Sequence, residues 1–124
     1  MSNLAPLQNL KSLRSLSLSG TRVENLGSLR GLSSLRYLDL FGVRTNDLES
    51  LSGLAQLDSL LLGNSQVPDL RPLVGLSRLR VLQLFRCNVL DISPLAGLNS
   101  LEELWLDSND IKDVGALGLS LIHI

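Results

Sequence analysis

Side chains that could carry out acid–base or nucleophilic chemistry are scarce in this chain of 124 residues. It has one histidine, His123, and one cysteine, Cys87. Serine is abundant, but a serine nucleophile needs a base beside it, and apart from His123 near the end of the chain there is no imidazole. The CxxC, HExxH and GxGxxG spacings, the Walker A motif and the EF-hand loop are also absent. The sequence therefore predicts no catalytic residues, no metal site and no cofactor, and it predicts that the chain is not an enzyme.

Aspartate recurs at a fixed interval of 22 residues, at Asp47, Asp69, Asp91 and Asp113. A column of carboxylates of this kind is compatible with a ladder of calcium ions. The alternative is that each aspartate caps the start of the segment that follows it, because Asp side chains readily accept hydrogen bonds from nearby backbone N–H groups. We favour the capping role.

Leucine recurs with the same period through most of the chain. Leu13, Leu16 and Leu18 are repeated at every addition of 22 residues, without exception, up to Leu101, Leu104 and Leu106. Two further apolar columns contain Leu4, Leu26, Leu48, Leu70, Ile92 and Val114, and Leu7, Leu29, Leu51, Leu73, Leu95 and Leu117. A unit of this length cannot bury its own apolar face and becomes stable only by stacking on its neighbours. The period therefore predicts a solenoid.

Each unit divides into two parts, which are clearest in residues 79–100, LRVLQLFRCNVLDISPLAGLNS. In the first part apolar and polar residues alternate with period two, which predicts a short strand with one buried face. The second part carries proline and glycine at fixed positions, for example Pro94 and Gly97. These residues favour a tight return made of turns or a short 3₁₀ helix over a long helix.

With these columns the chain resembles the leucine-rich-repeat proteins of the 22-residue class, which include the internalins and the regulatory subunit of protein phosphatase 1. The resemblance covers residues 1–118. It implies an α/β fold in the form of a right-handed solenoid, with parallel strands on the concave face and the returns on the convex face. For the parent protein it implies either a bacterial surface or secreted location, as for the internalins, or an intracellular one, so the localisation stays open.

In this family the ninth position of the unit is usually an asparagine whose amide ties adjacent coils together. The column here reads Thr21, Val43, Ser65, Cys87 and Asn109. The side chain of Val43 cannot donate a hydrogen bond, and Thr45 departs from the Val or Ile expected two places later. We therefore expect a weak point in this coil, costing about 1–3 kcal/mol if a carbonyl is left without a donor. Cys87 is interpreted as a small structural residue of the column rather than a reactive thiol.

Both ends of the chain are predicted to be cuts in a longer array. Met1 falls in the same column as Val23, so the first residue lies inside a unit, and the register is lost after Gly118. Residues 119–124 resemble the translation of a transposon-end adaptor used for sequencing libraries and are predicted to be a non-native tail. The alternative is a degenerate last strand. The predicted domain is thus an array of about five repeats over residues 1–118.

Charge and hydropathy restrict the kinds of partner. The net charge is −1 and there is no Lys/Arg-rich run, so a nucleic-acid partner is not expected. No apolar stretch approaches the roughly 18 residues of a membrane helix, and the N-terminus lacks a signal-peptide pattern, so no membrane insertion is expected. The charges are unevenly distributed, with six basic and two acidic residues in positions 1–44 and three basic and six acidic residues in positions 80–124. This asymmetry could orient a partner.

The outward face of the predicted strands carries the residues that vary between units. All four aromatic residues of the chain, Tyr37, Phe41, Phe85 and Trp105, fall on this face, and period two directs them to the same side. Clustered aromatic and arginine side chains are typical of protein-binding surfaces. The predicted partner-binding residues are Tyr37, Asp39, Phe41, Leu61, Gln83, Phe85, Arg86, Glu103, Trp105 and Asp107.

The sequence therefore predicts a protein–protein interaction module that binds a protein partner through its concave face and has no small-molecule substrate. Two alternatives remain. The array is the targeting arm of a larger enzyme whose catalytic domain lies outside these residues, or it is a structural spacer.

Overall fold

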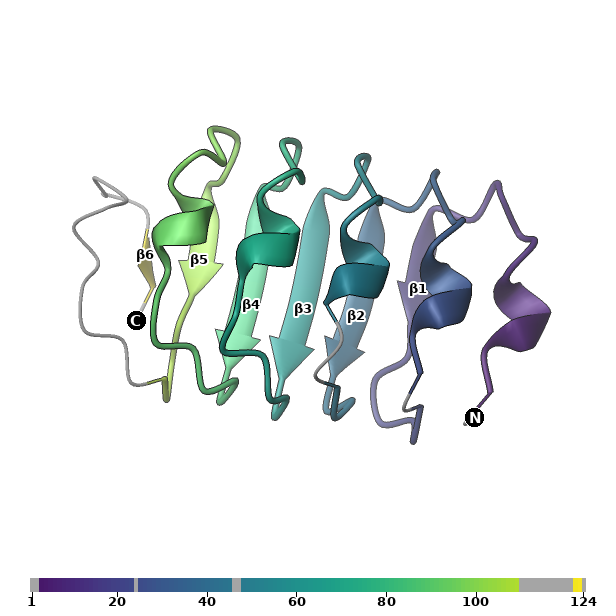
Figure 1. Cartoon of the computed structure of the whole chain (residues 1–124), viewed down its shortest axis with the longest axis horizontal. Helices are drawn as coiled ribbons and strands as arrows, with labels where there is room; N and C mark the ends of the chain where they lie inside the picture. Colours follow the sequence, from purple (N-terminus) through teal and green to yellow (C-terminus); the bar gives the residue numbers. More distant parts are fainter. Residues whose placement is uncertain (1–2, 24, 46–47, 110–121, 124) are drawn as a thin grey trace.

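A computed structural model describes residues 3–23, 25–45, 48–109 and 122–123. Strands and 3₁₀ helices alternate along the chain (Figure 1). The strands are β1 (Ser15–Ser17), β2 (Tyr37–Phe41), β3 (Ser59–Gly63), β4 (Val81–Phe85), β5 (Glu103–Trp105) and β6 (Ile122–His123). The 3₁₀ helices are η1 (Ala5–Leu7), η2 (Gly27–Leu29), η3 (Glu49–Leu51), η4 (Arg71–Leu73) and η5 (Ser93–Leu95).

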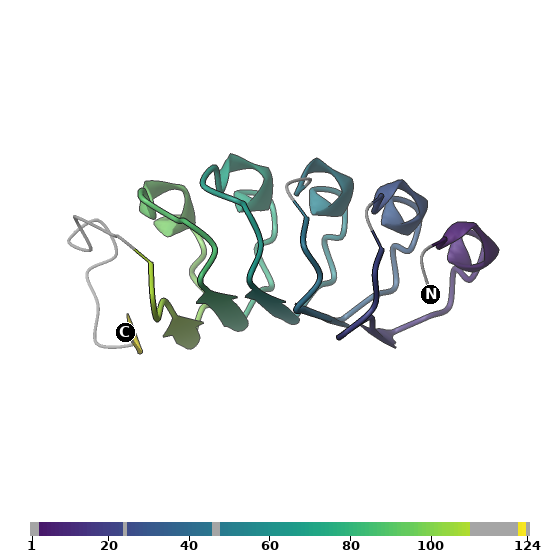
Figure 2. The ribbon, with the colours of Figure 1, turned by 90° about the horizontal axis from the view of Figure 1, so that it is seen from below.

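The strands form one parallel sheet in chain order from β1 to β6. From β1 to β5 each residue pairs with the residue 22 positions further on, as in Leu38 with Leu60 and Leu60 with Leu82. Figure 2 shows the strands along the inner side of an arc and the 3₁₀ helices along its outer side. The predicted leucine-rich-repeat solenoid, with strands on the concave face and short 3₁₀ returns on the convex face, is confirmed.

The last strand follows a different spacing. Leu104 of β5 pairs with Ile122 of β6, which lies 18 rather than 22 residues further on. Residues 110–121 and 124, which include the predicted end of the array at Gly118 and most of the predicted tail, lie outside the described residues. The assignment of residues 119–124 to a non-native tail stays a prediction.

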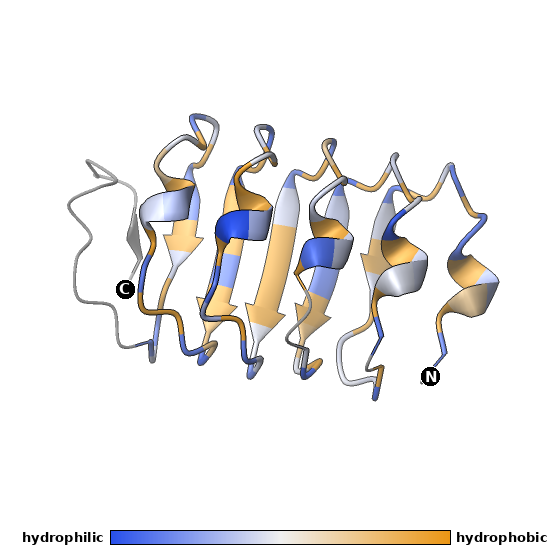
Figure 3. Ribbon diagram, viewed as in Figure 1, coloured by the Kyte–Doolittle hydropathy of each residue, from blue (hydrophilic) through white to orange (hydrophobic). Residues whose placement is uncertain are grey.

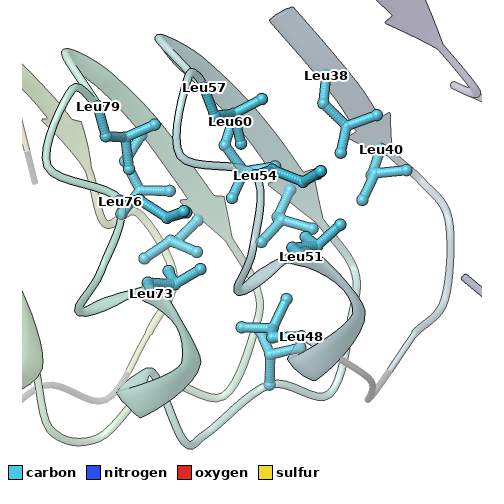
Figure 4. Close-up of a cluster of buried hydrophobic side chains, with 14 of the residues drawn as sticks. Leu38, Leu40, Leu48, Leu51, Leu54, Leu57, Leu60, Leu73, Leu76 and Leu79 are labelled. Carbon is cyan, nitrogen blue, oxygen red and sulfur yellow. The ribbon is translucent and has the colours of Figure 1, made fainter. Parts of the chain in front are cut away.

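The core consists of the leucine columns stacked from coil to coil (Figure 4). In the middle coils these side chains are fully buried; Leu38, Leu60 and Leu82, for example, have no exposed surface. Leu16, the member of the same column in the first strand, is only partly buried. This difference follows from the architecture, because each coil is covered by the coils on both sides and not by its own residues.

Asparagine or aspartate stabilises the start of each described return except that of η3, where the corresponding position, Asp47, is not described. The Oδ1 atom accepts a hydrogen bond from the backbone N–H two residues ahead, at Asn3, Asn25, Asp69 and Asp91, over 2.8–3.0 Å. For Asp69 and Asp91 the capping role is therefore confirmed. Asp47 and Asp113 lie outside the described residues.

The ninth column links adjacent coils at two of its positions. Asn109 donates from Nδ2 to the carbonyl of Leu84 in the preceding coil, and its Oδ1 accepts the N–H groups of Cys87 and Val89 at 2.9 and 3.1 Å. Ser65 donates from Oγ to the carbonyl of Val43 at 2.5 Å.

In Thr21 and Cys87, two other members of this column, the side chain forms a hydrogen bond within its own coil, and the side chain of Val43 forms none. Thr21 Oγ1 donates to the carbonyl of Leu18 at 2.8 Å, and Cys87 Sγ lies 3.3 Å from the carbonyl of Phe85. Burial raises the pKa of the Cys87 thiol, which agrees with a structural rather than a reactive role.

The backbone carbonyls that an asparagine at position 43 would have reached all accept hydrogen bonds from other donors. By comparison with Asn109, these are the carbonyls of Leu18, Leu40 and Phe41, which accept the Thr21 hydroxyl, the Val43 N–H and the Gly20 N–H respectively. The expected penalty for an unpaired carbonyl therefore does not arise there. Unlike Asn109, Val43 has a side chain that forms no hydrogen bond to the preceding coil.

We predict that Asn109→Val lowers the free energy of unfolding by at least about 2 kcal/mol, because buried N–H and carbonyl groups lose their partner. Cys87→Val is the matched control, since it changes the same column and removes only a weak bond within one coil; we expect a cost below about 1 kcal/mol. Urea unfolding followed by circular dichroism measures both. Equal costs for the two variants would contradict the assigned role of Asn109.

We predict that part of the stability of the return at η4 depends on the charge of Asp69. The Arg71 side chain and backbone N–H, which both bond to this carboxylate, lower its pKa from 3.8 to about 2. A lowered pKa contributes stability above pH 4 that is lost as the pH falls towards 2. Asp69→Asn retains the capping oxygen, as in Asn25, but should show a smaller fall in the urea midpoint between pH 4 and pH 2 than the wild type. An unchanged fall would show that the charge is unimportant.

Candidate protein-binding face

The strands present three columns of outward residues on the concave side of the sheet, which we call the strand face. The first column holds Ser15, Tyr37, Ser59, Val81 and Glu103; the second holds Ser17, Asp39, Leu61, Gln83 and Trp105; the third holds Ser19, Phe41, Gly63, Phe85 and Asp107. The leucines between these positions point into the core. Figure 3 shows β3 as an almost continuous hydrophobic strand, whereas β2 and β4 carry a hydrophilic band in the middle, where Asp39 and Gln83 flank Leu61.

Three aromatic side chains lie next to one another on the strand face. The ring centroids of Phe41 and Phe85 are 6.0 Å apart in an edge-to-face arrangement, and those of Phe85 and Trp105 are 6.4 Å apart. Both distances lie in the range of favourable aromatic pairs. Phe41 is exposed, and Phe85 and Trp105 are half-buried, so the rings offer apolar surface to a partner. We call Phe41, Phe85 and Trp105 the aromatic row.

Gly63 makes the contact between the first two rings possible. It lies on β3, paired with Phe41 on one side and Phe85 on the other. A Cβ atom at this position would come within 2.7 Å of Cδ2 and Cε2 of Phe41. The Phe41 ring therefore lies across the space that a side chain at position 63 would fill. Sequence reasoning did not identify Gly63 as a site residue, although a glycine in a column of larger outward residues was the available signal.

A small pocket adjoins the aromatic row. It has a volume of about 270 Å³ and is lined by Phe41, Asn64, Phe85, Arg86, Asp107 and Ser108. Four of the predicted site residues, Phe41, Phe85, Arg86 and Asp107, thus meet in one place. Oδ1 of Asp107 is buried and has no hydrogen-bond partner among the described residues. Asn64 and Ser108 occupy the same repeat position as Arg86 but were not selected, because the prediction favoured aromatic, arginine and strand residues.

The remaining predicted residues lie on the strand face but outside this pocket. Tyr37 is exposed at the start of β2, with Ser15 and Ser59 as its strand neighbours, and forms no ring contact within the described part of the chain. Glu103 is exposed at the start of β5. Leu61 and Gln83 are half-buried between Asp39 and Trp105.

Asp39 has a local structural role as well as an outward position. Its Oδ1 accepts the backbone N–H of Phe41 at 2.9 Å, and its Oδ2 accepts the hydroxyl of Ser17 at 3.2 Å. The first bond holds the end of β2, from which the Phe41 ring extends. Asp39 therefore positions the aromatic row in addition to facing a partner.

Charged side chains border the strand face where the strands begin. Arg80 lies between Asp58 and Glu102, with ion-pair distances of 3.4 and 2.5 Å, and these two carboxylates raise its pKa. All three side chains are exposed, so the pairs contribute little to stability. Their effect is to neutralise the charges at this edge of the strand face.

Neither a metal-binding group nor a membrane-spanning helix is found among the described residues. Within residues 3–23, 25–45, 48–109 and 122–123, no three His, Cys, Asp or Glu side chains are grouped in a way that could hold a metal ion. None of the helices in that part of the chain is long and apolar enough to cross a bilayer. What the strand face presents is a set of aromatic, amide and charged groups on a rigid sheet.

Comparison with known proteins agrees with this fold. The family model for leucine-rich repeats in two copies matches residues 11–56 and 77–119. Internalin C2 of Listeria monocytogenes is similar over the whole chain, with 38% identity and a TM-score of 0.94, and an internalin (inlF) of the same species is similar over 94% of the chain, with 32% identity and a TM-score of 0.87. A leucine-rich-repeat protein of Leptospira interrogans is similar over 95% of the chain, with 27% identity and a TM-score of 0.80.

The chain spans 55% of the length of internalin C2, 34% of the inlF structure and 33% of the Leptospira protein. Comparison with curated protein sequences gives no match. Internalin-like repeat proteins are typically non-enzymatic, and leucine-rich repeats in general bind proteins. The repeat period, the parallel sheet with its 3₁₀ returns and these similarities agree, and the chain belongs to the leucine-rich-repeat family, with an internalin-like form of the repeat.

Proposed function

We propose that the chain is a non-catalytic binding module that holds a protein partner against its strand face, with the aromatic row at the centre of the contact. The observation that carries this proposal is the row of ring contacts from Phe41, which lies over Gly63, to Phe85 and from Phe85 to Trp105, on the side of the sheet that faces away from the core. Aromatic side chains at the centre of an interface contribute a large share of binding energy.

The rigidity of the strand face supports the same function. Each outward side chain extends from a strand that is paired on both sides and packed on a leucine layer, from β2 to β4. A binding surface of this kind loses little conformational entropy when a partner docks. The location of all four aromatic residues on this one face is difficult to explain for a spacer, which would need no such surface.

The size of the strand face fits part of a protein interface. Five strands at a spacing of about 4.8 Å span about 24 Å. A standard interface covers about 800 Å² on each partner. The strand face can therefore supply the centre of such an interface, with other residues of the solenoid at its rim.

We predict that Phe41→Ala combined with Phe85→Ala and Trp105→Ala weakens binding of the partner at least tenfold, because truncated anchors cost roughly 2 kcal/mol or more each. The matched control is Val74→Ala with Leu90→Ala, which removes two apolar side chains, 57% and 54% exposed, from outside the strand face. We expect this control to bind like the wild type.

The measurement has two steps. Proteins retained by the immobilised wild type, the triple variant and the control are compared by quantitative mass spectrometry, and the dissociation constant of the partner is then determined by calorimetry. Circular dichroism confirms that each variant is folded, and Phe41→Ala alone serves as the least disruptive variant, since this ring is 41% exposed. Equal retention by all variants would favour the spacer.

A further inference from the structure

The turns that follow the strands enclose an open groove along one edge of the sheet, which is the lower edge in Figure 1. This edge groove has a volume of about 740 Å³ and is lined by Gly42, Arg44, Thr45, Asn64, Gln66, Arg86 and Asn88. Asn64 and Arg86 also line the pocket beside the aromatic row. The edge groove and the pocket therefore adjoin at these two residues.

The groups that line the edge groove are positive or amide in character. Two guanidinium groups and three side-chain amides face it, and none of its lining residues is an Asp or Glu. Arg44 also lines a neighbouring hollow of about 430 Å³ together with Arg22. Arginines therefore recur along this edge, at Arg22, Arg44 and Arg86.

The distinguishing feature of these arginines is that they line the edge groove or the hollow beside it. Among the described residues they form no ion pair, as is also true of Arg14, Arg30 and Arg36, whereas Arg71 and Arg80 are paired with carboxylates. The three arginines of this edge are exposed. Their guanidinium groups are thus available to a negatively charged ligand.

Arg86 occupies a backbone position that disfavours it. The corresponding residue in each coil has a positive φ, with values of 76° at Gly20, 80° at Gly42, 59° at Asn64, 52° at Arg86 and 61° at Ser108. Glycine and asparagine adopt this conformation most readily, and other residues adopt it at a cost. The first three coils use Gly, Gly and Asn. In the fourth coil an arginine is held there at a conformational cost, at the junction of the edge groove and the pocket.

We propose that the edge groove binds acidic side chains of the protein partner, within an extended segment that also places an apolar side chain in the pocket beside the aromatic row. This inference rests on the proposed function and specifies the chemistry of the partner. Arginine pairs with carboxylates through two parallel hydrogen bonds. The amides of Asn64, Gln66 and Asn88 can bond to the peptide groups of such a segment.

The dimensions of the groove agree with an extended segment. Arg44 and Arg86 lie two coils apart along the sheet, or about 10 Å at the usual strand spacing. An extended peptide covers this distance in about three residues. Two of the lining amides are held in place, since Asn88 Nδ2 donates to Gln66 Oε1 of the preceding coil.

The observations favour an acidic protein segment over a nucleic acid or a sulfated polysaccharide. Affinity for a polyanion grows with the number of anionic groups that are neutralised, and the described part of the chain places three arginines along this edge. The pocket of about 270 Å³ next to Arg86 provides an apolar contact that a carbohydrate or a phosphate backbone would leave empty.

The test uses the full chain and a fluorescent probe peptide of twelve residues, with one phenylalanine followed by alternating glutamate and glycine. The groove variant is Arg44→Gln with Arg86→Asn, where asparagine suits the positive φ as it does at Asn64. The matched control is Arg14→Gln with Arg36→Gln, which removes the same charge where the strands begin. Fluorescence anisotropy measures the affinity at 50 and 150 mM salt.

We expect the groove variant to weaken binding of the peptide at least tenfold and the control to change it less than twofold. A probe with glutamine in place of glutamate should bind at least tenfold more weakly. Arg86→Asn alone should leave the thermal midpoint unchanged or raise it, which shows that any loss of binding does not come from loss of the fold. The proposal is overturned if the peptide does not bind, or if both double variants lose affinity equally. It is also overturned if a heparin fragment or single-stranded DNA of equal charge binds more tightly than the peptide.

The two proposals can fail separately. If the alanine substitutions in the aromatic row abolish binding of the natural partner while the probe peptide shows no dependence on Arg44 and Arg86, the edge-groove proposal is wrong and the proposed function stands. If the peptide binds as expected but the natural partner is retained by the aromatic-row variant, the proposed function of the strand face is wrong.

Discussion

Each coil of this protein is stabilised by burial of its leucines against the coils on either side, and every other feature depends on that stacking. A single unit of 22 residues encloses too little apolar surface to fold alone. Stacking fixes the register of the sheet at the same 22-residue interval from β1 to β5. Because the register is fixed, outward residues of successive coils lie side by side, and a column in the sequence becomes a row of neighbours on the surface.

The outward side chains can differ from coil to coil because the inward leucines of the strands are the same in every coil. The third outward column contains a serine, a phenylalanine, a glycine, a second phenylalanine and an aspartate, all on the same backbone frame. This variation places a ring from β2 over the glycine of β3 and against a ring from β4. The next residue in each coil has a positive φ, and here too the sequence ranges from glycine to arginine. Thus one repeating scaffold carries both the aromatic row and the edge groove.

The leucine period was sufficient to predict a stack of strand-and-return units, because these depend on local periodicity, and the resemblance to leucine-rich repeats added the parallel sheet on the concave face. The period also placed the aromatic residues on the outer face of the strands. What it could not predict was which of them touch: Phe41 and Phe85 meet because Gly63 lacks a side chain, while Tyr37 lies apart at the other end of β2. Contacts of this kind depend on side-chain direction across three strands. The edge groove was missed for a similar reason, since the turns around it fall outside the alternating pattern.

Binding of a partner on the strand face can be observed directly at Trp105. This residue is the only tryptophan of the chain and the last member of the aromatic row. Fluorine-labelled tryptophan incorporated at this position gives a single ¹⁹F NMR resonance that reports on its surroundings. If the partner binds on the strand face, this resonance shifts and loses solvent accessibility when the partner is added in saturating amounts. An unchanged resonance at saturation would contradict binding on this face.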